Sequence, residues 1–259
     1  MKTHLVGFYG TRIYLPFSRL SREFKKRRNK PYKFLQKTSL PETSWKKLTK
    51  RRLVKIQESA KSNGNIRISE LGILCAFASE CKAGSNLFEI GTFDGRTTLN
   101  LAYVSPESCL VHTLDLPQDF GDTQFSLASG ESHLAKKENK NSRFEEYQRK
   151  NPDLLKKINR HFSDSATFDF TPYHDSCSLT FVDGSHAYEY VRKDTDSAIK
   201  ITQEGGIVIW HDYGIWEGVT QALEEMEEEF QLGLQHVKGT SLVYWTKPTQ
   251  DFSLNLASP

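Results

Sequence analysis

The chain has 259 residues, of which 37% are hydrophobic and 26% charged, which is an ordinary composition for a globular protein. No apolar run reaches the roughly 18 residues that a membrane span needs, and the N-terminus lacks the apolar core of a secretory signal, so we expect a cytoplasmic protein. The net charge of +3 hides an asymmetry, because residues 1–60 hold 17 Lys or Arg and three Asp or Glu, a net +14, and the remainder therefore carries −11.

Residues 1–60 are predicted to form a basic N-terminal extension. Its charge suits an acidic surface of the same chain or of a second subunit in a homodimer, and it equally suits a nucleic acid or another anionic surface. Aromatic and apolar residues within 1–20 indicate that this part is ordered against the body or a neighbour. A helix is predicted over 45–60, with Ser44 as its N-cap.

Residues 61–250 are predicted to form one domain, in which apolar strands alternate with amphipathic helices, and 251–259 a tail. This alternation is typical of an α/β fold, a Rossmann-like doubly wound sheet. A polar insertion at 118–157 interrupts it and is a candidate lid. The predicted strands are 87–90, 109–116, 160–163, 178–184, 205–213 and a pair within 234–247; the predicted helices are 69–81, 95–104, 188–201 and 218–230.

The first strand leads into a glycine loop and a helix in the sequence LFEIGTFDGRTTLNLA, residues 87–102. Its spacing is E-x-G-x-x-x-G over Glu89, Gly91 and Gly95, which differs from the G-x-G-x-x-G of dinucleotide sites. Glycines at such a turn would let a ligand approach backbone N–H groups. The pattern resembles motif I of the class I S-adenosylmethionine-dependent methyltransferases. That resemblance implies a seven-stranded sheet, with Glu89 binding the amino-acid end of the cofactor and Gly91, Thr92 and Gly95 passing beneath its sulfonium.

Acidic residues follow the later strands, at the sheet edge where open α/β sheets bind ligands. Asp115 ends the second strand, and a carboxylate there can accept hydrogen bonds from both ribose hydroxyls. Asp164 and Ser165 follow the third strand, where methyltransferases often contact adenine. Asp183 ends the fourth strand and is assigned to the same cofactor site. Each of these residues could instead be a turn former or a helix cap.

The segments FVDGSHAYEYVRKD (181–194) and GGIVIWHDY (205–213) resemble a small-molecule and sugar O-methyltransferase group within class I. Since imidazole titrates near neutral pH, His186 is the candidate general base, with Asp183 and His211 as further catalytic candidates.

Asp183 and Asp212 match the positions that bind magnesium in catechol-type enzymes. There the third ligand is an amide, whereas here Tyr213 takes its place. A donor from His186 or His211 would favour a transition metal over magnesium. If no metal binds, Asp212 is expected to orient His186 or His211.

The sequence therefore predicts a methyltransferase that uses S-adenosylmethionine, with or without a divalent metal, on a hydroxyl of a small molecule or sugar. One alternative is a methyltransferase acting on RNA or protein held by the basic extension. Another is a non-catalytic scaffold that binds the cofactor.

Overall fold

The computed structural model describes residues 2–9, 12–14, 34–51, 53–58, 66–131 and 142–249, the first two ranges by their backbone alone. Its main sheet has the strand order β3-β10-β11-β9-β8-β5-β6-β7. The five strands from β9 to β7 run parallel to one another. On the other side of β9, β11 is antiparallel to β9, β10 is antiparallel to β11, and β3 is parallel to β10. The strands are β3 (Glu42–Thr43), β5 (Asn86–Ile90), β6 (Leu110–Asp115), β7 (Ile158–Phe162), β8 (Cys177–Val182), β9 (Thr202–Trp210), β10 (Gln235–Val237) and β11 (Val243–Thr246).

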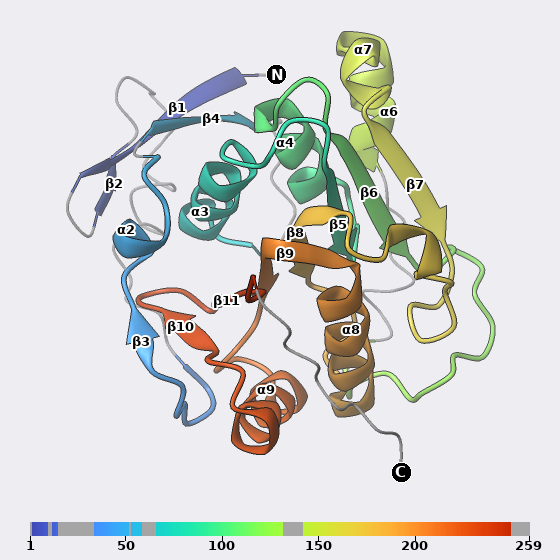
Figure 1. The fold of residues 1–259 in the computed structure, drawn as a ribbon. Coiled ribbons are helices and arrows are strands. Elements are labelled where there is room, and N and C mark those ends of the chain that lie inside the picture. Colours follow the sequence, from blue (N-terminus) through green and yellow to red (C-terminus); the bar gives the residue numbers. More distant parts are fainter. Residues whose placement is uncertain are drawn as a thin grey trace.

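The predicted doubly wound sheet is confirmed, because helices cover both of its faces (Figure 1). One face packs against α3 (Ile68–Ala78) and α4 (Arg96–Val104), and the other against α8 (Tyr188–Ile201) and α9 (Glu217–Phe230). Successive residues of one strand are buried on opposite faces of the sheet. Leu87 packs in the core on the side of α3 and α4, and Phe88 packs in the core on the side of α8 and α9. A strand buried on both sides needs a continuous apolar sequence, and this explains the composition of β5 and β8.

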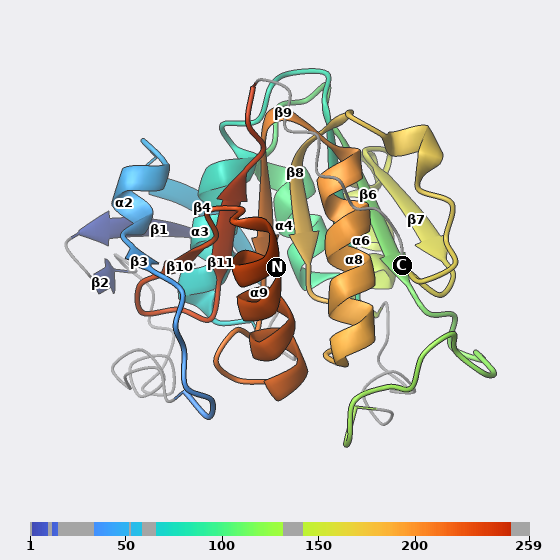
Figure 2. The same cartoon turned by 60° about the horizontal axis from the view of Figure 1, so that its bottom comes forward.

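The seven predicted strands are joined by an eighth, the two-residue β3, at the edge beyond β10. Turning the molecule shows β3, β10 and β11 side by side at one end of the sheet, and β6 and β7 at the other (Figure 2). The insertion between β6 and β7 ends in two short helices, α6 (Ser142–Lys150) and α7 (Pro152–Leu155). None of the described helices is both long enough and apolar enough to cross a membrane.

A second, three-stranded antiparallel sheet has the order β2-β1-β4, with β1 at Lys2–Tyr9, β2 at Arg12–Tyr14 and β4 at Leu53–Glu58. The helix predicted over 45–60 is therefore wrong after its first turn, α2 (Trp45–Leu48), whose N-cap is Ser44 as expected. The segment 53–56 instead alternates between exposed and buried residues, with Val54 and Ile56 buried beside α3 and α4. This two-residue period and the pairing with β1 favour a strand.

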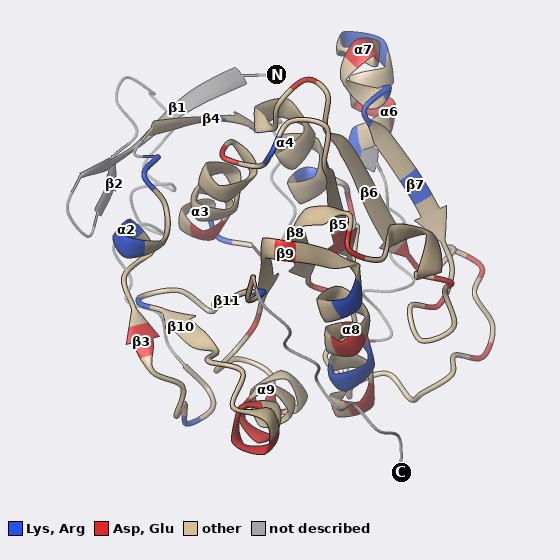
Figure 3. Ribbon diagram, in the orientation of Figure 1, with Lys and Arg blue, Asp and Glu red and all other residues tan. Residues whose placement is uncertain are grey.

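Charged residues are unevenly distributed over the described helices and strands (Figure 3). Acidic residues gather on α9, whose sequence includes the run 224–229, whereas α8 presents both signs. Residues 15–33, which hold eight of the 17 Lys and Arg of the predicted extension, lie outside the described residues. The boundary at residue 60 and the partners of the extension therefore stay predictions.

Candidate active site

The two glycines of the first loop are required by contacts within the protein. Gly91 and Gly95 have φ of +101° and +86°, where a side chain is strained. A Cβ on Gly91 would lie 1.9 Å from the carbonyl oxygen of Asp183, and one on Gly95 would lie 2.4 Å from the ring of Phe144. The first glycine thus lets β5 and β8 approach at the sheet edge, and the second lets α6 pack against the loop.

Glu89 and Thr92 are buried around this loop, and neither lines the cavity that opens at the carboxyl ends of the strands. One carboxylate oxygen of Glu89 accepts hydrogen bonds from the hydroxyls of Thr98 and Thr113, the second at 2.7 Å. Burial raises the pKa of Glu89 to about 8, against the opposing effect of these two hydroxyls. The Thr92 hydroxyl lies 2.6 Å from that of Thr113. These polar groups are therefore held by the protein itself.

A cavity opens at the carboxyl ends of β5, β6, β7 and β8, where sequence reasoning placed the site. Most of the predicted residues meet in its wall, whereas Glu89, Thr92, Gly95 and His211 do not reach it. The lining residues are Ile90, Gly91, Phe93, Leu114, Asp115, Leu116, Leu127, Glu131, Ser163, Asp164, Ser165, Asp183, Gly184, Ser185, His186, Tyr190 and Asp212.

Asp115 and Asp164 stand on the β6 and β7 side of this cavity. The carboxylate of Asp115 accepts the backbone N–H groups of Phe93 at 3.0 Å and Leu116 at 2.9 Å. That of Asp164 accepts the Tyr190 hydroxyl at 2.8 Å and the backbone N–H of Gln124 at 2.7 Å. Both carboxylates are therefore fixed in place beside the cavity, Asp164 partly by the chain of the insertion.

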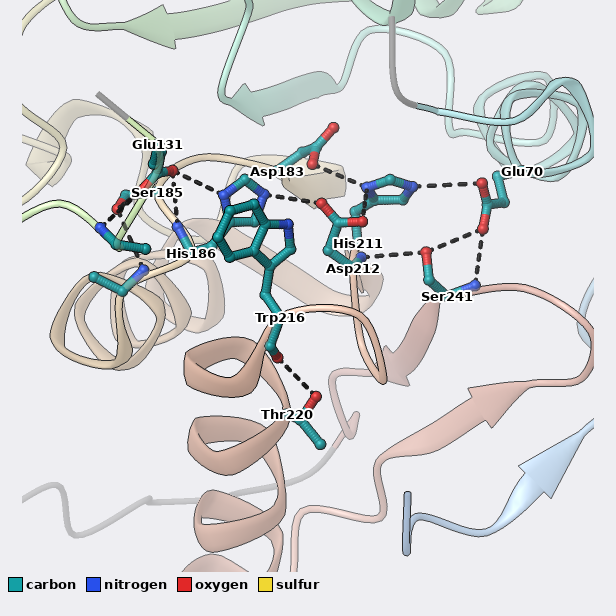
Figure 4. Close-up of polar contacts among 12 residues, drawn as sticks. Glu70, Glu131, Asp183, Ser185, His186, His211, Asp212, Trp216, Thr220 and Ser241 are labelled. Atoms are coloured by element: carbon teal, nitrogen blue, oxygen red, sulfur yellow. Dashed lines mark hydrogen bonds and ion pairs between the residues drawn. The ribbon is translucent and has the colours of Figure 1, made fainter. Parts of the chain in front are cut away.

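His186 lies between two carboxylates at the opposite wall (Figure 4). Its Nδ1 is 2.8 Å from Glu131 Oε1, and its Nε2 is 2.8 Å from Asp212 Oδ2. Trp216 stacks on the ring, with a centroid distance of 4.5 Å and an interplanar angle of 14°. Burial lowers the pKa of His186, but Asp212 and Glu131 outweigh it and raise the pKa to about 9. The imidazole is therefore protonated at neutral pH in this arrangement.

His211 also lies between carboxylates, but it does not line the cavity. Its Nδ1 lies 3.1 Å from Asp183 Oδ1 and 3.3 Å from Asp212 Oδ1, and its Nε2 lies 3.4 Å from Glu70 Oε2. The ring is 1% exposed. Burial opposes the charged form, yet Asp212 and Asp183 raise the pKa of His211 well above its ordinary value. His211 is thus a buried cation that holds both strand-end carboxylates.

Asp212 is the centre of the cluster. Its backbone has φ of +64°, a left-handed conformation rare for residues other than glycine. Burial alone would raise the pKa of Asp212, but the imidazoles of His211 and His186 hold it well below its ordinary range. Burial raises the pKa of Asp183, against the effect of His211.

The predicted metal ligands Asp183, His186 and Asp212 do come together. Each of the three offers one donor atom, and these atoms all lie within 4.8 Å of one another. Two carboxylates with one imidazole form a donor set that suits a divalent transition metal, and its carboxylates also suit magnesium.

Two residues of the cluster, Glu131 and Glu70, were missed by the sequence reasoning. Glu131 is one of several acidic residues in the polar insertion, and no pattern in the sequence distinguishes it from the others. Glu70 lies on α3, which is buried nearly all round. A charged residue in an otherwise apolar helix was a usable signal, because a buried carboxylate needs partners. It finds them in His211 and in Ser241, whose N–H and hydroxyl donate to Glu70 Oε1 at 2.8 and 3.0 Å.

Comparison with known proteins agrees with this architecture. Residues 88–213 match a protein family described as a methyltransferase domain. The structure of the O-methyltransferase NovP superposes with a TM-score of 0.57 and 19% identity, covering 73% of this chain and 84% of that one. A structure from Corynebacterium glutamicum superposes with a TM-score of 0.51 and 13% identity, covering 73% and 85%. At these identities the superpositions show a shared fold. No curated protein matches the chain by sequence.

Proposed function

We propose that this chain is a class I S-adenosylmethionine-dependent methyltransferase that methylates a hydroxyl of a small molecule or sugar, with His186 as general base. The observation that carries the proposal is the place of His186, an imidazole set by two carboxylates in the wall of the strand-end cavity. An O–H acceptor needs a base within hydrogen-bond reach, and His186 is the imidazole that lines this cavity among the described residues.

The cavity wall fits a cationic cofactor. Gly91, Asp115, Asp164, Ser165 and Asp183 all line it, so its polar part is rich in carboxylates. A pyrophosphate would be repelled there, whereas a sulfonium and an ammonium group would be attracted. In the proposed arrangement Asp115 binds the ribose hydroxyls and Asp164 with Ser165 faces the adenine. Bound S-adenosylmethionine supplies a methyl group that is already activated for displacement.

The residues then have to orient the acceptor and remove its proton. When His186 is neutral, Nδ1–H is still donated to Glu131, and the lone pair of Nε2 can accept the acceptor's O–H proton once that hydroxyl has taken the place of Asp212 at Nε2. Displacement at the methyl carbon would then form the oxygen–carbon bond of the product and break the carbon–sulfur bond, with S-adenosylhomocysteine as the leaving group. Glu131 at Nδ1 and the nearby carboxylate of Asp212 both stabilise the imidazolium that results.

A metal-dependent version uses the same residues differently. A divalent cation held by Asp183, Asp212 and His186 would lower the pKa of the acceptor hydroxyl and fix its position. The two versions exclude each other at one atom, because a metal on Nε2 of His186 would occupy the lone pair that the base requires. His211, which already contacts one oxygen of each carboxylate, favours the metal-free version.

The test is methyl transfer from labelled S-adenosylmethionine to a panel of phenols, catechols and sugars, with and without EDTA. His186→Ala is expected to lower kcat about 10²- to 10⁴-fold, the usual range for a general base, and to change the Kd of the cofactor only a few-fold. His174→Ala, an exposed histidine, is the matched control. Full turnover by His186→Ala would remove the proposed base. Loss of activity in EDTA, restored by a divalent metal, would favour the metal-dependent version.

A further inference from the structure

We propose that Glu131 is a positioning residue, which fixes the orientation and the tautomer of His186 from the insertion between β6 and β7. The expected effect on kcat rests on the proposed function, whereas the orientation of the His186 ring rests on the hydrogen bonds of Glu131. Glu131 is 5% exposed and lines the same cavity as His186, although 55 residues separate them in sequence.

The carboxylate of Glu131 is surrounded by donors. Oε1 accepts the backbone N–H of His186 at 3.0 Å and faces its Nδ1 at 2.8 Å. Oε2 accepts the hydroxyl of Ser185 at 2.9 Å and the backbone N–H of Ala128 at 3.0 Å. The two backbone N–H groups and the Ser185 hydroxyl already donate to this carboxyl group, which favours its ionised form, and an ionised carboxylate can accept hydrogen bonds but cannot donate one. Nδ1 of His186 must therefore carry the hydrogen.

This assignment decides what Nε2 can do. While Asp212 is in contact both ring nitrogens donate, Nδ1 to Glu131 and Nε2 to Asp212. A neutral imidazole has one N–H and one lone pair, so once an acceptor hydroxyl has displaced Asp212, a hydrogen kept on Nδ1 by Glu131 leaves the lone pair on Nε2. Nε2 is the atom directed at Asp212, and it is the atom that either takes the acceptor's proton or binds a metal. Without Glu131, the tautomer with hydrogen on Nε2 becomes accessible, and that tautomer can do neither.

The insertion also contacts the cofactor side of the cavity. Leu127 lines the wall, Phe125 packs edge-on against Tyr190 at 5.4 Å, and Gln124 donates its N–H to Asp164. The same stretch of chain, 124–131, thus contacts the predicted adenine region and the imidazole. The position of His186 therefore depends on a segment that also lines the predicted cofactor site.

The experiment compares Glu131→Gln and Glu131→Asp with the wild type, and uses Glu189→Gln, an exposed glutamate on α8, as the matched control. A glutamine keeps the size of the side chain, but its amide can donate to Nδ1 and stabilise the wrong tautomer. We expect Glu131→Gln to lower kcat at least about 100-fold with a change in cofactor Kd of less than about fivefold. Glu131→Asp should restore part of kcat, because it keeps the charge.

The ¹⁵N chemical shifts of the His186 ring, measured above pH 9.5, provide a readout that does not depend on activity. In the wild type Nδ1 should show the shift of a protonated nitrogen and Nε2 that of an unprotonated one, and Glu131→Gln should reverse or mix the two. An unchanged Nδ1 shift in Glu131→Gln, or a kcat within threefold of the wild type, would overturn the proposal. If the wild type transfers no methyl group but the shifts change as expected, the assigned chemistry is wrong while the positioning by Glu131 stands.

Discussion

The buried carboxyl group of Glu89 should make the stability of the fold depend on pH, and Glu89→Gln should remove that dependence. Burial raises the pKa of Glu89 from 4.5 to about 8, and the side chain is 1% exposed. The folded protein therefore keeps this proton over a range in which the unfolded chain loses it. The contribution of Glu89 to stability is fully present below pH 4.5 and is lost as the pH rises through 8.

The magnitude follows from the difference between the two pKa values. Each unit corresponds to about 1.4 kcal/mol, so between pH 5 and pH 8 Glu89 should lower the free energy of unfolding by about 3 kcal/mol. Glutamine has nearly the same shape, and its carbonyl oxygen can still accept the hydroxyl hydrogens of Thr98 and Thr113. The variant should therefore lose this pH dependence and keep the packing.

The assay is reversible urea unfolding of the wild type and Glu89→Gln at pH 5, 6.5 and 8, with Glu204→Gln as an exposed control. Other buried groups also titrate in this range, but they are common to both proteins. The difference between the two unfolding free energies therefore isolates Glu89. A difference that stays constant within about 0.5 kcal/mol from pH 5 to pH 8 would refute the reasoning.

Two further substitutions test the cavity wall. Gly91→Ala places a Cβ against the Asp183 carbonyl at a positive φ and should destabilise the fold by at least about 2–3 kcal/mol in thermal unfolding. Gly130→Ala, also at positive φ but with open space around it, should cost only about 1 kcal/mol, and an equal loss in both variants would contradict the steric argument. Asp115→Ala should raise the Kd of S-adenosylmethionine at least about tenfold by calorimetry, since a site built to bind hydroxyls loses its acceptor, and an unchanged Kd would place the ribose elsewhere.

The parallel part of the sheet could be predicted because its determinants are local. Each buried strand is a short apolar run, and α8 combines an apolar stripe with a polar start, so it was predicted at 188–201 and is found at Tyr188–Ile201. The strand β4 could not be predicted in this way. Its partner β1 lies about fifty residues earlier, and the basic residues before Leu53 hid the two-residue period that distinguishes a strand from a helix.

The site residues that could be predicted likewise have local determinants, whereas the missed residues depend on contacts between distant segments. Asp115, Asp183 and Asp212 each follow a predicted strand, and parallel strands bring their carboxyl ends to one edge, so their meeting follows from topology. Glu131 reaches His186 from an insertion, and Glu70 reaches His211 across 141 residues from a helix on one face of the sheet. No period or turn rule encodes such contacts, because they depend on how a loop and a helix pack.

The five side chains Glu131, His186, Asp212, His211 and Glu70 form one chain of alternating acids and imidazoles across the site (Figure 4). Each imidazole lies between carboxylates, so each is stabilised as a cation, and Asp212 at the centre is held by both. A proton can leave this chain readily only in the part that lines the cavity, because the His211 ring is 1% exposed whereas Glu131, His186 and Asp212 line the wall. An acceptor hydroxyl that enters between His186 and Asp212 would break one link of the chain and take the place of Asp212 at Nε2. The proposed proton transfer is therefore confined to His186, while His211 keeps Asp183 and Asp212 in position.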